Sequence, residues 1–137
     1  MSAAPSRRDD LGRLILMSAA EIEELPWRQL GENPGVTYKV LWRSGDVYLG
    51  TLHLEPGAVE PERVHHAAHI HFLVTQGSAR IVDRMLEAGS YAYIPPGVPH
   101  EVSASDEGCT LFYTYRPFEI PTGPPGSPMD DDWGAPG

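Results

Sequence analysis

Four of the six histidines of this chain lie in one short run, "VHHAAHIHF", as His65, His66, His69 and His71. Imidazole nitrogens are good ligands for Fe(II), Zn, Cu and Ni. Side chains alternate between the two faces of a β-strand, so His69 and His71 would share a face and His65 and His66 would not. The run therefore suggests a metal site, and it offers more than one possible set of ligands.

A fifth histidine follows a second distinctive segment, "GSYAYIPPGVPHEVSA". Pro95 and Pro96 have a fixed φ, whereas Gly97 is free to adopt the positive φ that tight reversals need. The segment predicts a sharp turn that delivers His100 to the start of the next strand, where its side chain can point inward.

The elements that must position these histidines are mostly strands. Residues 36–43 and 46–54 are rich in β-branched and aromatic residues and are separated by "SGD", which is typical of a hairpin. "IHFLVT", "SARIVD", "SYAYIP", "HEVSA" and "CTLFYTYR" follow, each bounded by turn-forming residues. Many short strands favour an all-β sandwich or barrel. One short helix is predicted after Ser18, because Glu21 stands at the capping-box spacing and Pro26 would end the helix.

Composition narrows the function classes. The chain has 137 residues, which suggests one domain, and a formal net charge of −9 with Lys39 as its only lysine. No basic stripe of the kind that nucleic-acid binders carry is visible. There is no apolar run of about 18 residues that could span a membrane. The N-terminus does not resemble a secretory signal, and Cys109 is the only cysteine, so we expect a cytoplasmic protein without disulfides.

The two ends differ in composition from the middle. Residues 1–10 form a short, polar segment, which we expect to be flexible. Residues 121–137 combine prolines, glycines and three consecutive aspartates, which predicts a disordered tail. Residues 11–120 would then form the folded domain.

The second segment resembles a motif of the cupin superfamily, G-x5-P-x-G-x2-H. Gly89, Pro95, Gly97 and His100 match it in full, whereas Ala104 replaces the asparagine that usually follows. The resemblance covers roughly residues 36–118. It implies a double-stranded β-helix, which is a jelly-roll barrel, for residues 11–120.

The first cupin motif is only partly matched. It is bounded by Gly57 and Gly77, but the glutamate of the family falls on Ile70. The second histidine of the motif falls on His66, and the first falls on Val64, next to His65. No carboxylate therefore stands at the expected position.

The resemblance implies that the chain binds one divalent metal ion inside the barrel. The expected ligands are His66, His71 and His100, with His65 and His69 as replacements if the strand register shifts by one residue. Fe(II) is favoured, and Zn, Ni, Mn and Cu are alternatives. Three neutral histidines would leave the ion its full charge and open coordination positions. A cupin that binds no metal remains an alternative.

Other side chains are weaker candidates. Glu60 and Glu62 precede the histidine run and could reach it only if their loop folds over the mouth of the barrel. Glu101 should point away from His100, on the opposite face of its strand. The alternating tyrosines 91, 93, 113 and 115 are expected to serve packing, and His53 to have a structural role.

The resemblance also suggests an activity. Several three-histidine cupins are Fe(II) dioxygenases that cleave small diketones or hydroxylated aromatic ketones, and we expect this chain to act similarly on a small molecule. The alternatives are a non-redox metal-dependent isomerase or cyclase, and a cupin that binds a small ligand without catalysis. Small cupins commonly form homodimers, and the strand "VTYKVLW" is the segment expected to cross to a partner.

Overall fold

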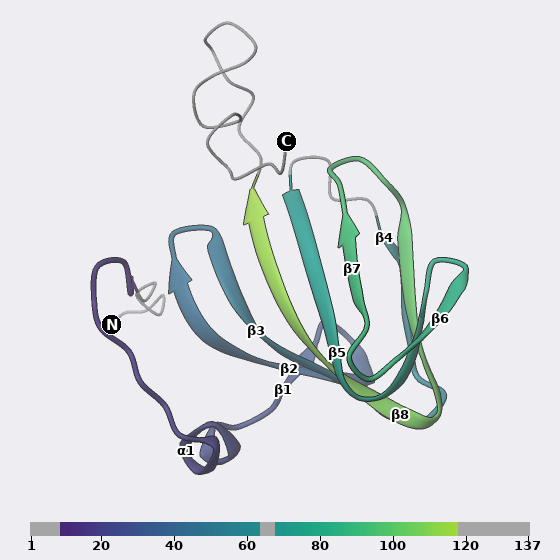
Figure 1. Ribbon diagram of the computed structural model, residues 1–137, viewed down its shortest axis with the longest axis horizontal. Helices are drawn as coiled ribbons and strands as arrows, with labels where there is room; N and C mark the ends of the chain where they lie inside the picture. Colours follow the sequence, from purple (N-terminus) through teal and green to yellow (C-terminus); the bar gives the residue numbers. More distant parts are fainter. Residues whose placement is uncertain (1–8, 64–67, 118–137) are drawn as a thin grey trace, which may run out of the picture.

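The computed structural model describes residues 9–63 and 68–117 (Figure 1). Apart from one helix, the regular elements among these residues are strands, as the sequence predicts. In chain order the elements are α1 (Ala19–Glu24), β1 (Arg28–Leu30), β2 (Asn33–Ser44), β3 (Val47–Leu54), β4 (Val59–Arg63), β5 (Ala68–Ile81), β6 (Arg84–Glu87), β7 (Tyr91–Ile94) and β8 (His100–Pro117).

The helix α1 begins at the predicted capping box. The Glu21 backbone N–H donates to the Ser18 hydroxyl at 3.1 Å, and the Ser18 backbone N–H donates to the Glu21 carboxylate at 2.9 Å. The helix ends at its C-cap, Leu25, directly before Pro26. Both predicted ends are therefore confirmed.

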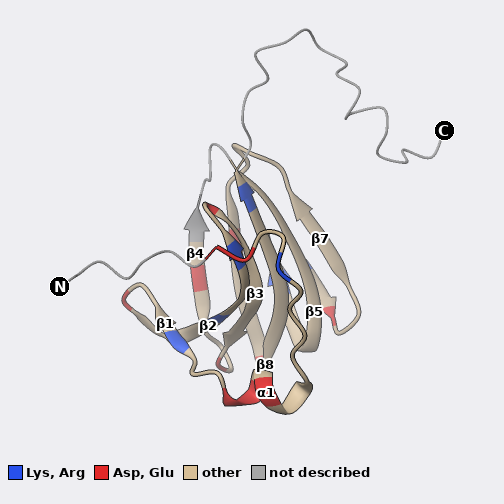
Figure 2. Ribbon diagram, turned by 90° about the vertical axis from the view of Figure 1, so that its left-hand side faces the viewer, with Lys and Arg blue, Asp and Glu red and all other residues tan. Residues whose placement is uncertain are grey.

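A buried lysine attaches α1 to the outside of the barrel. The Nζ atom of Lys39, on β2, donates to the backbone carbonyl of Ile22 at 2.8 Å and lies 4.5 Å from the centroid of the Trp27 ring. A cation at a helix C-terminus satisfies carbonyl groups that have no partner within the helix. Acidic residues of α1 gather at this end of the molecule (Figure 2).

The strands pair antiparallel in the order β1-β2-β3-β8-β5-β6, with β4 added to β8 and β7 added to β5. β5 and β8 are long and pair with each other twice, on either side of irregularities at 74/76 and 77/79 in β5. These bulges bend both strands, so that each strand contributes to two facing walls. The predicted strands "IHFLVT" and "SARIVD" therefore belong to one bent strand, as do "HEVSA" and "CTLFYTYR".

The hydrophobic core lies between the two walls. Strand alternation decides which side chains enter it: Leu52 and Leu54 on β3 are buried, whereas Thr51 and His53 between and beside them are only partly buried. The largest fully buried side chains are Leu54, Leu111, Val36, Val74 and Val102.

The segment expected to cross to a partner, within β2, is paired on both sides within the chain. β3 pairs with β2 along the length of β2, and β1 pairs with β2 at Asn33, Thr37 and Tyr38. Within the described residues, no helix has the length and apolar character needed to cross a lipid bilayer.

The predicted flexible ends lie largely outside the described residues, and the tail 121–137 lies entirely outside them. Asp9 and Asp10 are described, and Asp10 is held against β2. The Asp10 N–H donates to the Arg43 carbonyl at 2.7 Å, and the Arg43 backbone N–H donates to the Asp10 carboxylate at 3.1 Å.

Candidate functional site

A cavity of about 280 Å³ lies between the two walls of the barrel. Leucine, valine, isoleucine and phenylalanine side chains form much of its lining. The polar groups that face it are Arg43, Glu60, His100 and the tyrosines 38, 48, 113 and 115. An apolar cavity with a few convergent polar groups is the usual form of a small-molecule site.

His100 is the first residue of β8 and is only 5% exposed. The turn before it contains Gly97 at φ +84°, as the sequence predicts, and it directs the imidazole into the cavity. The Nδ1 atom lies 3.3 Å from the Val98 carbonyl oxygen. A carbonyl only accepts, so Nδ1 carries the proton and, in the neutral ring, the lone pair lies on Nε2. Metal-ligating histidines are commonly oriented in this way.

Glu60 faces the same cavity from β4 and is 7% exposed. β4 pairs with the start of β8, and Glu60 lies opposite Val102, another lining residue. The sequence pointed to Glu60 only as part of a loop, whereas it is a wall residue. Strand periodicity could have found it, because it shares a face with Ala58, which packs against the core, while Val59 between them is 40% exposed.

His69 and His71 lie on the outer face of β5. Their neighbours Ala68, Ile70 and Phe72 are buried on the inner face, and the last two line the cavity. His69 and His71 share a face of β5, as predicted. This face is opposite to the one that lines the cavity with His100. The structure therefore does not bring His71, or its replacement His69, together with His100.

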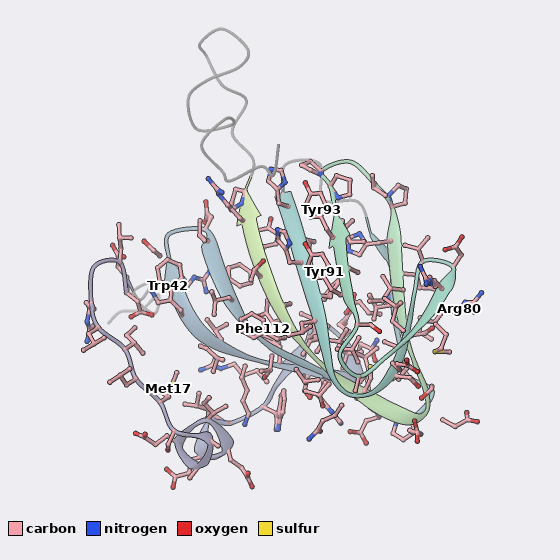
Figure 3. All side chains as sticks on the ribbon, in the orientation of Figure 1. Met17, Trp42, Arg80, Tyr91, Tyr93 and Phe112 are labelled. Carbon is pink, nitrogen blue, oxygen red and sulfur yellow. The ribbon has the colours of Figure 1, made fainter. Side chains whose placement is uncertain are left out.

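The outer histidines pair instead with tyrosines of β7. The Nδ1 atom of His69 lies 2.6 Å from the Tyr93 hydroxyl, and that of His71 lies 2.6 Å from the Tyr91 hydroxyl. Both tyrosines project from β7 beside β5 (Figure 3). Burial, and then the neighbouring His69, lower the pKa of His71 below its ordinary value.

The remaining two predicted ligands, His65 and His66, lie outside the described residues, in the connection between β4 and β5. In the part of the chain that is described, no group of three or more histidine, cysteine, aspartate or glutamate side chains is arranged to hold a metal ion. Of the described side chains of these four types, His100 and Glu60 line the cavity.

A β-bulge brings Arg43 into the cavity. Along β2 the pairing with β3 runs regularly to Val40–Gly50 and then shifts, so that Trp42 lies opposite Leu49 and Arg43 lies opposite Tyr48. A straight strand would have kept Val40 and Trp42 on one face and turned Arg43 outward. The additional residue reverses this, and Arg43 joins Val40 in lining the cavity.

Gly50 permits the close approach of the two strands at the bulge. A Cβ atom at this position would lie 1.8 Å from the Lys39 carbonyl oxygen and 3.0 Å from the Val40 Cα. Contacts this short are not possible for a side chain, so the bulge requires glycine on the facing strand.

Three tyrosines surround the guanidinium end of the cavity. Tyr48 stacks on Tyr115 with ring centroids 4.8 Å apart, and Tyr113 meets Tyr48 edge-on at 6.0 Å. The Arg43 Cζ atom lies 5.1 Å from the centroid of the Tyr48 ring. Burial raises the pKa of Tyr48 and of Tyr113, so both are neutral phenols at neutral pH. The packing role predicted for Tyr113 and Tyr115 is present, but these rings also line the cavity, which the sequence did not indicate.

Two weaker candidates lie away from the cavity. Glu101 is exposed, as expected from its alternation with His100. His53 contacts the Thr110 hydroxyl at 3.0 Å and the Glu55 carboxylate at 2.9 Å, which fits a structural role. The side chain of Glu62 is not among those described.

Comparison with known families identifies the chain. A family model described as the ChrR cupin-like domain matches residues 17–119. The chain belongs to this cupin family. The match spans most of this cupin and confirms both the superfamily and the jelly-roll fold that the motif around His100 implied. No curated protein matches the sequence significantly.

Solved cupins have the same fold. KdgF from a Halomonas species is 20% identical, with a TM-score of 0.63 over 71% of this chain and 92% of its own. A predicted oxalate decarboxylase from Thermotoga maritima is 13% identical, with a TM-score of 0.64 over 71% of this chain and 96% of its own. A chain in the complex of Rhodobacter sphaeroides SigE with the anti-sigma ChrR is 24% identical, with a TM-score of 0.59 over 69% of this chain and 50% of its own.

Proposed function

We propose that this cupin binds one divalent metal ion together with a small organic molecule in its barrel cavity. The observation that carries the proposal is the pair His100 and Glu60: one imidazole and one carboxylate, from neighbouring strands, both nearly fully buried and both lining a single cavity. Charged and polar groups are rarely buried unless they pair with each other or coordinate an ion.

The proposed ligands are the Nε2 atom of His100, the carboxylate of Glu60, and one imidazole from His65 or His66. Nitrogen and carboxylate ligands of this kind suit Fe(II), Zn, Mn and Ni. Glu60 would replace the glutamate ligand of the family, because Ile70 occupies the position of that glutamate in this chain. It would also lower the charge of the site by one compared with three neutral histidines. The bound ion would act as a Lewis acid on a ligand oxygen or, if it is iron, supply redox chemistry.

The metal proposal is tested by measuring the metal content of the full-length protein. His100→Ala and Glu60→Gln should each remove most of the bound ion, because each takes one ligand from a small set. His69→Ala and His71→Ala are matched controls on the outer face, and they should retain the metal content of the wild type. Unchanged metal in His100→Ala, or loss in the two controls, would show that the site lies elsewhere.

An Fe(II) dioxygenase that acts on a small diketone or hydroxylated aromatic ketone is the more specific form of the proposal. Its support is the wall of tyrosine rings that lines the same cavity as His100 and Glu60, because such a wall suits a flat substrate. Such a reaction inserts both atoms of O2 into the products of carbon–carbon cleavage, so it needs no separate reductant. The protein would contribute substrate orientation and exclusion of bulk water from the cavity.

Oxygen consumption distinguishes this activity from the alternatives. The iron-loaded protein should take up one O2 for each small diketone consumed, and His100→Ala should not. Turnover without oxygen uptake would indicate a non-redox isomerase or cyclase. Binding without turnover would indicate a ligand-binding cupin.

We also propose a homodimer. β2 is covered within the chain, so the support shifts to β1, a short strand at one end of the strand order, because such edges invite pairing. Light scattering of the full-length protein should give twice the mass of one chain. A single-chain mass at high protein concentration would contradict the dimer.

A further inference from the structure

We infer that the Arg43 end of the cavity is an anion-binding subsite, which selects small planar carboxylates as ligands of this cupin. This inference deepens the proposed function, because it names the ligand class of the same cavity. It does not depend on the metal, since Arg43 and its neighbours are described independently of the His65–His66 connection.

Arg43 reaches the cavity only through the bulge in β2. A regular β2 would keep Arg43 on the outer face, where a cation needs no special arrangement. The bulge between Val40 and Trp42, with Gly50 opposite, turns it inward instead. Bulges are often found where a strand must re-aim a functional side chain.

The guanidinium group of Arg43 lies beside a backbone carbonyl and an aromatic ring. Among the described side chains, no carboxylate lies within 4.0 Å of the Arg43 guanidinium, the distance limit of an ion pair. Asp10 binds the backbone N–H of Arg43, not the guanidinium. The Nε atom donates to the Gly45 carbonyl at 3.3 Å, which orients the planar group. The other donors of an oriented guanidinium match the two oxygens of a carboxylate.

A wall of tyrosine rings lines the cavity beside Arg43. Tyr48, Tyr113 and Tyr115 add aromatic surface beside Arg43, and burial raises the pKa of the Tyr48 and Tyr113 phenols further above neutral pH. A stacked pair of rings offers a flat face for a flat ligand body. The cavity of about 280 Å³ corresponds to roughly nine water molecules at about 30 Å³ each. It therefore suits a ligand of about the size of benzoate and not a polymer.

The test compares benzoate with benzamide, which has nearly the same shape and no charge. Calorimetric titrations use the full-length protein, both as purified and after treatment with EDTA, so that binding through a metal ion is separated from binding through Arg43. Benzoate should bind at least about tenfold more tightly than benzamide in both preparations.

Substitutions then assign the preference to Arg43. Arg43→Gln should bring the two affinities together, and Arg43→Lys should restore only part of the difference, because lysine keeps the charge and loses the planar fork. Arg80→Gln, at an exposed position of β5, is the matched control and should behave as the wild type. A thermal melt of each variant verifies that it is folded.

The inference is overturned if the wild type binds benzoate no more tightly than benzamide, if it binds no benzoate at millimolar concentrations, or if folded Arg43→Gln retains the preference. Metal content is measured on the same samples. Wild-type protein that takes up no metal ion but prefers benzoate would refute the metal proposal and leave this inference standing. Wild-type protein that binds a metal ion but shows no preference for benzoate would refute this inference and leave the metal proposal standing.

Discussion

Replacing Gly50 with alanine tests the bulge on which the position of Arg43 depends. The new Cβ atom would lie 1.8 Å from the Lys39 carbonyl oxygen, whereas ordinary contacts begin at 3.4 Å. The strands β2 and β3 would therefore have to separate locally by the difference, 1.6 Å.

The cost can be estimated from two terms. Such a separation would break about two hydrogen bonds of the β2–β3 ladder, at about 1 kcal/mol each. Forcing an additional methyl group into a closely packed site adds about 1–3 kcal/mol of strain. We expect Gly50→Ala to lower the free energy of unfolding by about 3–5 kcal/mol in total, a large fraction of the roughly 5–15 kcal/mol typical of a domain.

Urea unfolding followed by tryptophan fluorescence measures this change. Gly45→Ala, in the turn of the same hairpin, is the control: its Cβ atom meets nothing within 4 Å, and its φ of +57° is the only source of cost. That cost should be about 1 kcal/mol. In a folded Gly50→Ala protein the preference for benzoate should also fall, because Arg43 is displaced. If the two variants are equally stable, the close approach at Gly50 is not present in solution.

Three further predictions concern other parts of the barrel. Burial raises the pKa of the Cys109 thiol to about 11, so a thiol-specific reagent at pH 8 should label Cys109 only when urea unfolds the chain. Lys39→Met should remove the bond to Ile22 and destabilise the protein by about 1.5–3 kcal/mol, with increased amide exchange in α1. The pKa of His71 lies below its ordinary value of 6.5, so the unfolded chain binds a proton first as the pH falls. The melting temperature should therefore decrease from pH 6.5 downward until the lower folded-state pKa is passed, and less steeply in His71→Asn; equal slopes would contradict the shift.

Local sequence signals predicted much of the fold. The capping box, the hairpin between β2 and β3 and the turn before His100 depend on residues close to one another in the chain, so their patterns can be recognised directly. The joining of short strands into β5 and β8 could not be seen. Gly77 and Gly108, which interrupt the pattern, lie where the paired strands approach closely: a Cβ atom at Gly77 would meet the Gly108 carbonyl oxygen at 2.1 Å.

The site was predicted less completely. The cupin motif places the glutamate of the family on Ile70, and this position does face the cavity. Side chains alternate along a strand, so His69 and His71 must then face outward. The predicted ligands were chosen because they are histidines, without applying this alternation. Glu60 was only a weaker candidate because β4 was taken for a loop. Arg43 could not have been found from the alternation of "VTYKVLWR", because the bulge depends on Gly50, on another strand.

β8 contributes both His100, its first residue, and Tyr115, near its end, to the lining of the same cavity. One bent strand therefore carries a proposed metal ligand and part of the tyrosine wall, and it is hydrogen-bonded to β5 on both sides of the bend. A ligand that is too long or too short cannot be accommodated by the walls sliding apart. Exchange with solvent should instead be gated at the rim, and selectivity by ligand length should persist when rim residues are changed.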